Sequence, residues 1–322
     1  MQRTSIIVVL LWAVGYVVCH GGNFAAELSH RREYLEKRGA SLREARDQCA
    51  RGGIDHRELY ERAIRDIQVT HDLDGAYIER ALPDYNHTHY TGDKYTVTTD
   101  PHEIFQKYNT CALSPDVTEG PFYVEGELVR RDIVDGQPGV PLHLKIRVKD
   151  FATCADVSGA LVEVWHANAL GTYSGTGAEH GKTYLRGLQR TDGMGVVSFD
   201  TVFPGHYYER APHVHVAVHV SGTREDPDGA VRDNVVSLSA QVFFDQDLIL
   251  AVERQEPYRD NEQPFMYNAD DGFLQQEAAA RFDPFVDWVA LSENANDGLL
   301  AWITVGANLT EHRELSVADH RP

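Results

Sequence analysis

The stretch Leu142-His143-Leu144-Lys145-Ile146-Arg147-Val148 alternates strictly between apolar and polar residues. Successive side chains of a strand point to opposite faces, so this period of two predicts a β-strand with one apolar face. Six further short apolar or alternating runs follow, at residues 160–166, 195–199, 213–220, 236–244, 285–291 and 299–305. Turn formers such as Asp192-Gly193 separate the runs. The pattern predicts a mainly β protein with an antiparallel β-sandwich core, rather than alternating βαβ units.

The chain before this region has a different composition. Residues 23–74 are rich in Arg, Glu, Ala and Leu with helical spacing, and Gly52-Gly53 interrupts them. We expect an N-terminal helical segment there, and a connector over residues 75–110 that packs across the main domain. The predicted organisation is therefore a signal peptide at 1–22, the helical segment and connector at 23–110, and the β-sandwich domain at 111–322.

The first residues have the features of a secretory signal. Met1-Gln2-Arg3 carries a positive charge, an apolar run extends from Ile6 to Cys19, and Gly21-Gly22 supplies small residues. The apolar run is short for a membrane span, although a non-cleaved anchor is the alternative. We expect a secreted, extracellular protein.

Cysteines and sequons fit secretion. Removing the signal peptide leaves Cys49, Cys111 and Cys154, and an oxidising compartment favours a disulfide among them. Three single pairings are possible. Cys111 and Cys154 flank the predicted β region, which favours that pair and leaves Cys49 free or paired between chains. Asn86 and Asn308 begin N-x-T sequons and are candidate glycosylation sites.

The charge of the chain limits its partners. The formal net charge is −19 over 322 residues. Nucleic acids and anionic membranes need a basic surface, so we expect neither as a partner. The sequence leaves the oligomeric state open and favours a monomer. A small molecule is the expected partner.

The stretch Pro204-Gly-His-Tyr-Tyr-Glu-Arg-Ala-Pro-His-Val-His215 carries candidate metal ligands. His213 and His215 share one face of a predicted strand, and imidazole suits zinc, copper, iron and nickel. Tyr207 lies just after the Pro-Gly turn, and Tyr173 follows another strand. A phenol ordinarily titrates near pH 10, but a hard trivalent cation would keep it ionised as a ligand.

Three segments occur in an order that resembles a known family. They are T-E-G-P-F-Y at 118–123, V-W-H-A-N-A-L-G-T-Y-S at 164–174, and the Pro204–His215 stretch. Together they resemble the intradiol ring-cleavage dioxygenases, typified by protocatechuate and catechol dioxygenases. The resemblance spans residues 111–244 and is closest to the secreted single-chain branch, in which a cysteine precedes S-P-x-V-T-E-G-P.

The resemblance implies a mononuclear, non-haem Fe(III) centre with four protein ligands. The matching positions are Tyr173, Tyr207, His213 and His215, and Arg210 matches the arginine that faces the aromatic ring of the substrate. This chain reads R-A-P-H where the family usually reads R-P-A-H, which leaves the ligands in register but could alter the loop. The adjacent Tyr208 is an alternative to Tyr207, although the turn register favours Tyr207.

The resemblance also implies a substrate pocket and a reaction. Residues matching the pocket are Thr118, Gly120, Pro121, Phe122 and Tyr123, and Gln241 matches a buried glutamine near the iron. A catechol and O2 are the implied substrates, with ring cleavage between the two hydroxyl-bearing carbons to a cis,cis-muconate-type diacid. Tyr207 is the ligand expected to leave when the catechol binds, and Arg210 would stabilise the negative charge that develops on the ring.

Two other functions are compatible with parts of the sequence. A secreted β-sandwich carrier of a metal or of small aromatics needs the two histidines but not Tyr173, Tyr207 and Arg210. Extradiol cleavage uses ferrous iron with two histidines and a carboxylate, a triad that does not stand out here. The remaining histidines of the region, His166, His206 and His219, are expected to pack or to form hydrogen bonds.

Overall fold

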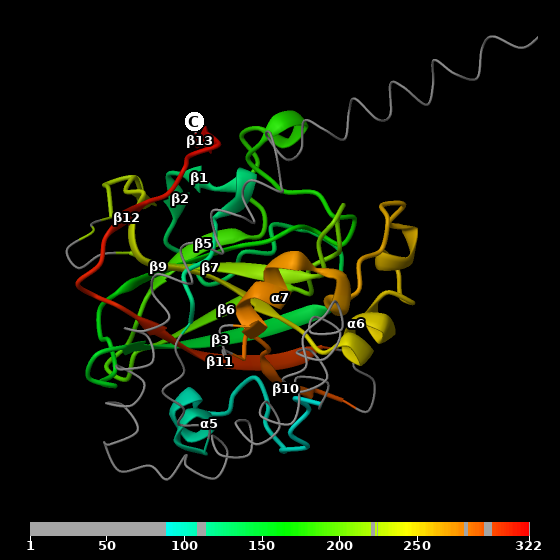
Figure 1. The fold of residues 1–322 in the computed structure, drawn as a ribbon, viewed down its shortest axis with the longest axis horizontal. Helices are drawn as coiled ribbons and strands as arrows, with labels where there is room; N and C mark the ends of the chain where they lie inside the picture. The colour runs from blue at the N-terminus through cyan, green and yellow to red at the C-terminus, as the bar shows by residue number, and fades with distance from the viewer. Residues whose placement is uncertain are drawn as a thin grey trace, which may run out of the picture.

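The computed structural model describes residues 88–107, 114–219, 223, 225–279, 283–292 and 298–321. Two β-sheets pack face to face in this part of the chain (Figure 1). The first has the order β10 (Asp287–Ala290), β11 (Leu299–Ala307), β3 (Pro141–Asp150) and β6 (Val196–Val202). The second has the order β12 (Arg313–Glu314), β9 (Val235–Phe243), β7 (His213–His219), β4 (Leu161–Trp165) and β5 (Arg186–Arg190). The mainly β sandwich is therefore confirmed, whereas residues 1–87, which include the predicted signal peptide and the predicted helices at 23–74, lie outside the described residues.

Short elements complete the described structure. Strand β1 (Val124–Glu125) pairs in parallel with β13 (Asp319–His320), and β2 (Glu127–Leu128) pairs with β8 (Ala230–Val231). The helices are α5 (Pro101–Lys107), α6 (Gln246–Val252) and α7 (Gly272–Ala279), with 3-10 turns η2 (Gly120–Phe122), η3 (Gly177–Glu179), η4 (Tyr258–Asp260) and η5 (Asn268–Asp270). No described helix has the length and apolar character needed to cross a bilayer.

Each of the seven runs singled out in the sequence contains a strand, namely β3, β4, β6, β7, β9, β10 and β11. Within the two main sheets of the described chain, one pairing is parallel. Strand β11 runs parallel to β3, with Leu299 opposite Leu142 and Ala307 opposite Asp150. A parallel pair needs a long connection, and here nearly the whole sandwich lies between the two strands.

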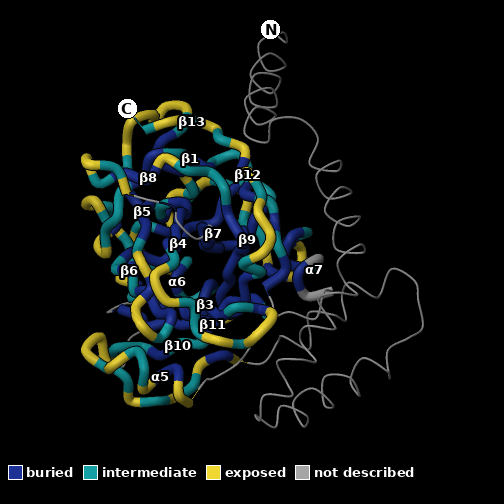
Figure 2. The backbone as a smooth tube through the Cα atoms, turned by 90° about the vertical axis from the view of Figure 1, so that its left-hand side faces the viewer, coloured by how far each residue is buried: buried dark blue, intermediate teal, exposed yellow. Residues whose placement is uncertain are grey.

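The core lies between the two sheets. From β7 it receives Val214, Val216 and Val218, and from β3 it receives Leu142, Leu144, Ile146 and Val148. Residues alternate in direction along a strand, so the same register that buries the valines places His213 and His215 on the opposite face of β7. That outer face is also buried, as the dark blue of β7 in Figure 2 shows.

The polar face of β3 is buried as well, because the connector covers it. Ile104 and Phe105 of α5 pack with Trp302 of β11 over the first sheet. Beneath them Arg147 donates hydrogen bonds to both carboxylate oxygens of Asp156, each at 2.8 Å. This ion pair allows a cation to remain in the covered face. Helix α5 therefore lies against the outer face of the first sheet (Figure 1).

Candidate metal centre and active site

The candidate site lies on the outer face of the five-stranded sheet. In the β-ladder His215 of β7 is opposite Trp165 on one side and Gln241 on the other. The Trp165 ring stacks on the His215 imidazole, with centroids 4.7 Å apart and an interplanar angle of 5°. A rigid central strand and this stacking fix the direction of the imidazole.

Two loops carry the tyrosines to this face. We call Asn168–Tyr173 the first tyrosine loop and Pro204–Arg210 the second tyrosine loop. In the first, the Asn168 side-chain oxygen accepts hydrogen bonds from the backbone N–H groups of Leu170 and Thr172, each at 3.0 Å. An asparagine that binds backbone ahead of it nucleates a tight turn. In the second, the Arg210 N–H donates to the Tyr207 carbonyl at 3.0 Å, which closes a turn around Tyr208 and Glu209.

The four residues proposed as ligands converge. The Tyr207 phenol oxygen lies 3.3 Å from Nε2 of His213, and that nitrogen lies 3.2 Å from Nε2 of His215. The Tyr173 ring stands edge to face against the Tyr207 ring, with centroids 5.5 Å apart. All four side chains are buried. Residues from three separate parts of the sequence therefore form one cluster of two imidazoles and two phenols.

The histidines are held in the state that binds metal. Nδ1 of His213 lies 2.7 Å from the Ala211 carbonyl oxygen, which assigns the proton to Nδ1 and leaves the lone pair of Nε2 facing the cluster. Burial lowers the pKa of His213 and of His215 well below the usual value, and the positive charge of Arg210 lowers both further. Neutral imidazoles with free lone pairs are the form that ligates a metal.

Burial keeps both phenols in the neutral form in the metal-free protein. Burial raises the pKa of Tyr173 well above its usual value, and burial also raises the pKa of Tyr207 against the opposing charge of Arg210. The Tyr173 phenol oxygen is buried and has no hydrogen bond of ordinary geometry within the described chain. A buried polar atom of this kind calls for a further partner. A hard cation bound by the cluster would supply it, so the residues present fit a metal with two oxygen and two nitrogen donors.

The geometry favours Tyr207 over its neighbour Tyr208. Tyr207 is buried within the cluster, whereas Tyr208 is partly exposed. The backbone N–H of Tyr208 donates to the Gln263 side chain at 3.1 Å. The tyrosine favoured by its position after the Pro-Gly turn, Tyr207, is thus the one whose phenol lies next to His213.

Arg210 is buried beside the cluster and is not a surface residue. Its Nε donates to Asp271 at 2.9 Å, its guanidinium lies 3.5 Å from the Tyr207 oxygen, and it also donates to the Gln241 side-chain oxygen. Burial would lower the pKa of Arg210, but the charge of Asp271 outweighs it and raises the pKa. The Phe273 ring covers the guanidinium at 4.5 Å from its centroid. A permanent positive charge is therefore fixed next to Tyr207.

Asp271 was not identified from the sequence, although it holds Arg210 in place. One carboxylate oxygen accepts hydrogen bonds from the N–H groups of Phe273 and Leu274, as an N-cap of α7 does. The other oxygen accepts from Nε of Arg210 and from the Ala211 N–H, each at 2.9 Å. An aspartate before an apolar helix is a capping signal in the sequence. The contact of Asp271 with Arg210 gives no such signal, because the two residues are 61 positions apart.

The segment predicted to line the pocket lies over the cluster. Phe122 stacks on Tyr173 with centroids 4.4 Å apart, and a Cβ added to Gly120 would lie 3.6 Å from the His215 ring. The Gln241 amide donates to the Thr118 carbonyl at 3.2 Å. The half-buried members are Thr118, Gly120, Pro121 and Phe122. Tyr123 is buried and packs on Trp165, one layer behind His215.

The C-terminal strand region supports this segment. The Glu119 carboxylate accepts a hydrogen bond from Arg313 at 2.6 Å and another from the Ser316 N–H at 2.7 Å. The Ala318 N–H donates to the Tyr123 carbonyl at 2.9 Å. Two segments nearly 200 residues apart in the sequence therefore build one wall, which no local pattern in the sequence could indicate.

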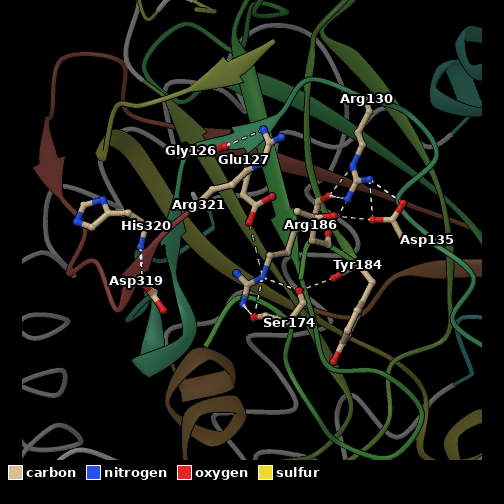
Figure 3. A network of polar contacts seen from close by, with 11 residues as sticks. Gly126, Glu127, Arg130, Asp135, Ser174, Tyr184, Arg186, Asp319, His320 and Arg321 are labelled. Atoms are coloured by element: carbon tan, nitrogen blue, oxygen red, sulfur yellow. Dashed lines mark hydrogen bonds and ion pairs between the residues drawn. The ribbon is translucent and has the colours of Figure 1, made fainter. Parts of the chain in front are cut away.

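A network of polar and ionic contacts includes Glu127, Ser174 and Arg186 (Figure 3). The Arg186 guanidinium donates to the carbonyl and to the hydroxyl of Ser174, and its carbon lies 5.8 Å from the centroid of the Tyr173 ring. Glu127 is 1% exposed, and its carboxylate reaches Nε of Arg186 at 3.9 Å without any hydrogen bond in the described structure. Burial raises the pKa of Glu127 to about 7, although the charge of Arg186 opposes this. No motif in the sequence indicated Glu127 or Arg186.

The other histidines have protein partners. His166 lies 2.8 Å from the Thr201 hydroxyl, His206 lies 2.8 Å from Glu253, and His219 lies 2.8 Å from Glu163. Burial lowers the pKa of His166 to about 4. These contacts agree with the packing and hydrogen-bonding roles expected for the three histidines.

Other predicted positions lie away from the cluster. Cys154 is disulfide-bonded, but its predicted partner Cys111 lies outside the described residues, as does Asn86. Asn308 is partly exposed, and its side-chain oxygen accepts a hydrogen bond from the Thr310 hydroxyl at 2.8 Å. No group of three or more His, Cys, Asp or Glu side chains in the described ranges could hold a metal ion. The cluster above differs because half of its donors are phenols.

Comparisons with known proteins identify similar dioxygenases. Residues 114–251 match the family model described as Dioxygenase. The catechol 1,2-dioxygenase 2 of Acinetobacter lwoffii is 35% identical over 136 residues, which cover 35% of this chain and 48% of that protein. The chain thus spans about half the length of this curated relative.

Solved structures also resemble the sandwich. An intradiol ring-cleavage dioxygenase from Tetranychus urticae is 29% identical with a TM-score of 0.52, covering 62% of this chain and 96% of the other. A second dioxygenase structure is 27% identical with a TM-score of 0.53, covering 66% of this chain and all of the other at 100%. The family model, the curated relative and these structures together indicate the intradiol ring-cleavage dioxygenase family.

Proposed function

We propose that this protein is a non-haem Fe(III) enzyme that cleaves a catechol with O2 between its two hydroxyl-bearing carbons, giving a cis,cis-muconate-type diacid. The relatives named above are a catechol dioxygenase and an intradiol ring-cleavage dioxygenase. The observation that carries the proposal is the convergence of two buried neutral imidazoles and two buried phenols on one point, with a fixed arginine beside them.

The four donors suit a ferric ion. Tyr173, Tyr207, His213 and His215 would hold it, and ionisation of the two phenols supplies negative charge that stabilises the trivalent state. When bound, the ion supplies a Lewis-acid site that holds the deprotonated catechol for reaction with O2. Burial of every ligand excludes water from the centre and strengthens these electrostatic interactions.

Tyr207 is the ligand we propose to exchange for the substrate. Its phenol lies within 3.5 Å of the Arg210 guanidinium, which would stabilise the oxygen while it leaves the cluster. As a phenolate it would take one proton from the incoming catechol at its phenol oxygen. Tyr173 has no such donor on its oxygen among the described residues, and we propose that it is the ligand that stays.

Arg210 is proposed to stabilise the substrate during the reaction. Negative charge develops on the aromatic ring as it reacts with O2, and a fixed cation in a buried site lowers the energy of that state. Asp271 and Gln241 hold the guanidinium, so little reorganisation is needed when the charge appears. Phe122, stacked on Tyr173, would offer an apolar face to the substrate ring.

We further propose that the protein is secreted. The charged and apolar N-terminus, the Cys111–Cys154 pair and the sequons at Asn86 and Asn308 support this location. The substrate would then be an extracellular catechol, and we propose that the enzyme acts as a monomer.

The test is to purify the secreted protein, measure its metal content and record its visible spectrum. A ferric ion bound by two tyrosinates gives a burgundy-red colour, and addition of catechol should shift the band and start O2 uptake. The products should be ring-opened diacids. A colourless protein fully loaded with zinc would instead identify a carrier.

A further inference from the structure

The segment between α6 and η5 contacts both tyrosine loops at once. It includes η4 and continues through Asn261 and Gln263. We infer that Gln263, assisted by Asn261, is a positioning residue that clamps the two tyrosine loops together and so sets the spacing of Tyr173 and Tyr207. Its effect on turnover rests on the proposed function, but the clamp itself is a property of the folded chain.

The Gln263 side chain joins the backbones of the two loops. Its amide nitrogen donates to the carbonyls of Leu170 and Gly171 in the first tyrosine loop, at 2.9 and 3.1 Å. Its amide oxygen accepts from the N–H of Tyr208 in the second tyrosine loop at 3.1 Å. Both ends of one planar amide are satisfied, so the loops cannot separate without breaking hydrogen bonds at one end.

Asn261 forms a second bridge in parallel with the first. Its amide nitrogen donates to the carbonyl of His206 at 2.8 Å and to that of Ala169 at 3.3 Å. Its oxygen accepts from the backbone N–H of Gln263 at 3.1 Å, which orients the neighbouring amide. The Gln263 carbonyl in turn lies 3.0 Å from Nε2 of His206. The two amides and this imidazole form one connected network.

The loops touch through their backbones, and two glycines make this possible. A Cβ on Gly171, which has φ of +74°, would collide with the Gln263 amide and with the His206 carbonyl. A Cβ on Gly205 would lie 2.5 Å from the carbonyl oxygens of Asn168 and Ala169. Side chains are excluded from this contact, so the clamp holds the loops at the closest approach that backbone allows.

This arrangement bears on the exchange of Tyr207. Tyr207 lies between His206 and Tyr208, and both of these residues are bonded through their backbones to the clamp. With the backbone held on each side, departure of the phenol is confined to rotation of the side chain. Return of the phenol to the same position needs no refolding of the loop, which is the advantage of a preorganised site.

Substitutions of Gln263 test the clamp in the metal-free protein. Gln263→Glu keeps the acceptor for the Tyr208 N–H but places an oxygen against the carbonyls of Leu170 and Gly171, and Gln263→Met removes all three bonds at similar volume. We expect the amide hydrogens of both tyrosine loops to exchange about tenfold faster in each variant, as the loss of hydrogen bonds worth about 1.4 kcal/mol predicts. Gln255→Ala is the matched control, because no side-chain hydrogen bond of Gln255 occurs among the residues described.

A second measurement uses the iron-loaded protein. We expect both Gln263 variants to bind iron in normal amount, to show a shifted tyrosinate charge-transfer band and to lose kcat more than KM rises. Unchanged exchange in the two loops, or an unchanged band and kcat, would overturn the inference. Faster loop exchange in the Gln263 variants, together with a wild-type protein that binds no iron, would refute the proposed function while leaving the clamp intact.

Discussion

The phenol oxygen of Tyr207 lies 3.3 Å from Nε2 of His213, and both atoms are buried. His213 comes from a central strand, whereas Tyr207 comes from a loop that turns back over it. A strand atom is fixed by its ladder, and a loop side chain has freedom to rotate. In the proposed enzyme, the contact therefore joins a metal ligand that stays, His213, to a metal ligand that exchanges with the substrate, Tyr207.

Loss of a permanent donor should remove the metal. Tyr173→Phe or His215→Ala is expected to abolish iron binding, colour and activity, because the first removes an anionic donor and the second leaves a buried ferric ion one protein ligand short. Iron content per chain and the visible spectrum measure this. Tyr208→Phe is the matched control and should stay red. A Tyr208→Phe protein without iron, beside a red Tyr207→Phe protein, would reverse the assignment of the two tyrosines.

Loss of the fixed cation should affect turnover more than metal binding. We expect Arg210→Ala to keep iron and colour but to lower kcat about a hundredfold or more, the scale of removing one electrostatic stabiliser. Oxygen uptake at saturating catechol gives kcat. Arg232→Ala removes an exposed arginine paired with Asp226 and Asp228 and serves as the control. Unchanged turnover in Arg210→Ala would refute the role proposed for this residue.

The buried pair behind Tyr173 should contribute strongly to stability. Arg186→Met leaves Glu127 buried without its cation. Because the pKa of this carboxyl is already raised to about 7, we expect the loss in the free energy of unfolding to grow with pH and to reach about 3–5 kcal/mol where the carboxylate is ionised. The double variant Glu127→Leu with Arg186→Met should lose much less. Urea denaturation of the metal-free proteins measures both. Equal losses in the single and double variants would show that Glu127 and Arg186 are not coupled.

The contribution of His89, in the connector, to the free energy of unfolding should depend on pH. Burial alone would lower the pKa of His89, but hydrogen bonds to Asp245 and Asp283 raise it to about 10. The unfolded value is near 6.5, so the stabilisation by protonated His89 is complete below that pH and is lost as the pH rises towards 10. A nearby carboxylate, Asp287, has its pKa raised by burial to about 6 and ionises at the lower end of this range.

Replacement of His89 isolates this effect. The difference in free energy of unfolding between wild type and His89→Gln should shrink steadily from pH 6.5 to pH 10. Urea denaturation across that range measures it, and His102→Gln, at a half-buried histidine of the same connector, serves as a control. A difference that stays constant with pH would contradict the assignment of a charged His89.

Much of the fold followed from local pattern. Alternation in Leu142–Val148 and the six later runs predicted strands because a half-buried strand needs one apolar face. Strand β5, Arg186–Arg190, escaped notice because its residues R-G-L-Q-R do not alternate, and its pairing with β4 comes from the neighbouring strand. Parallel pairing of β3 with β11 was also beyond prediction, since strand direction is set by the path of the chain between them.

The sequence by itself determined that His213 and His215 share a face of one strand, because two residues make one period of the pleat. Its motifs also indicated Tyr173, Tyr207 and Arg210. Only the tertiary structure decided what holds these side chains: Asp271 on Arg210, Glu127 and Arg186 behind Tyr173, and Gln263 between the two tyrosine loops. Such partners lie far away in the chain, and a contact between distant residues leaves no period or spacing in the sequence. Strands and turns follow from neighbouring residues in the sequence, whereas the contacts that hold the site depend on which distant segments the fold brings together.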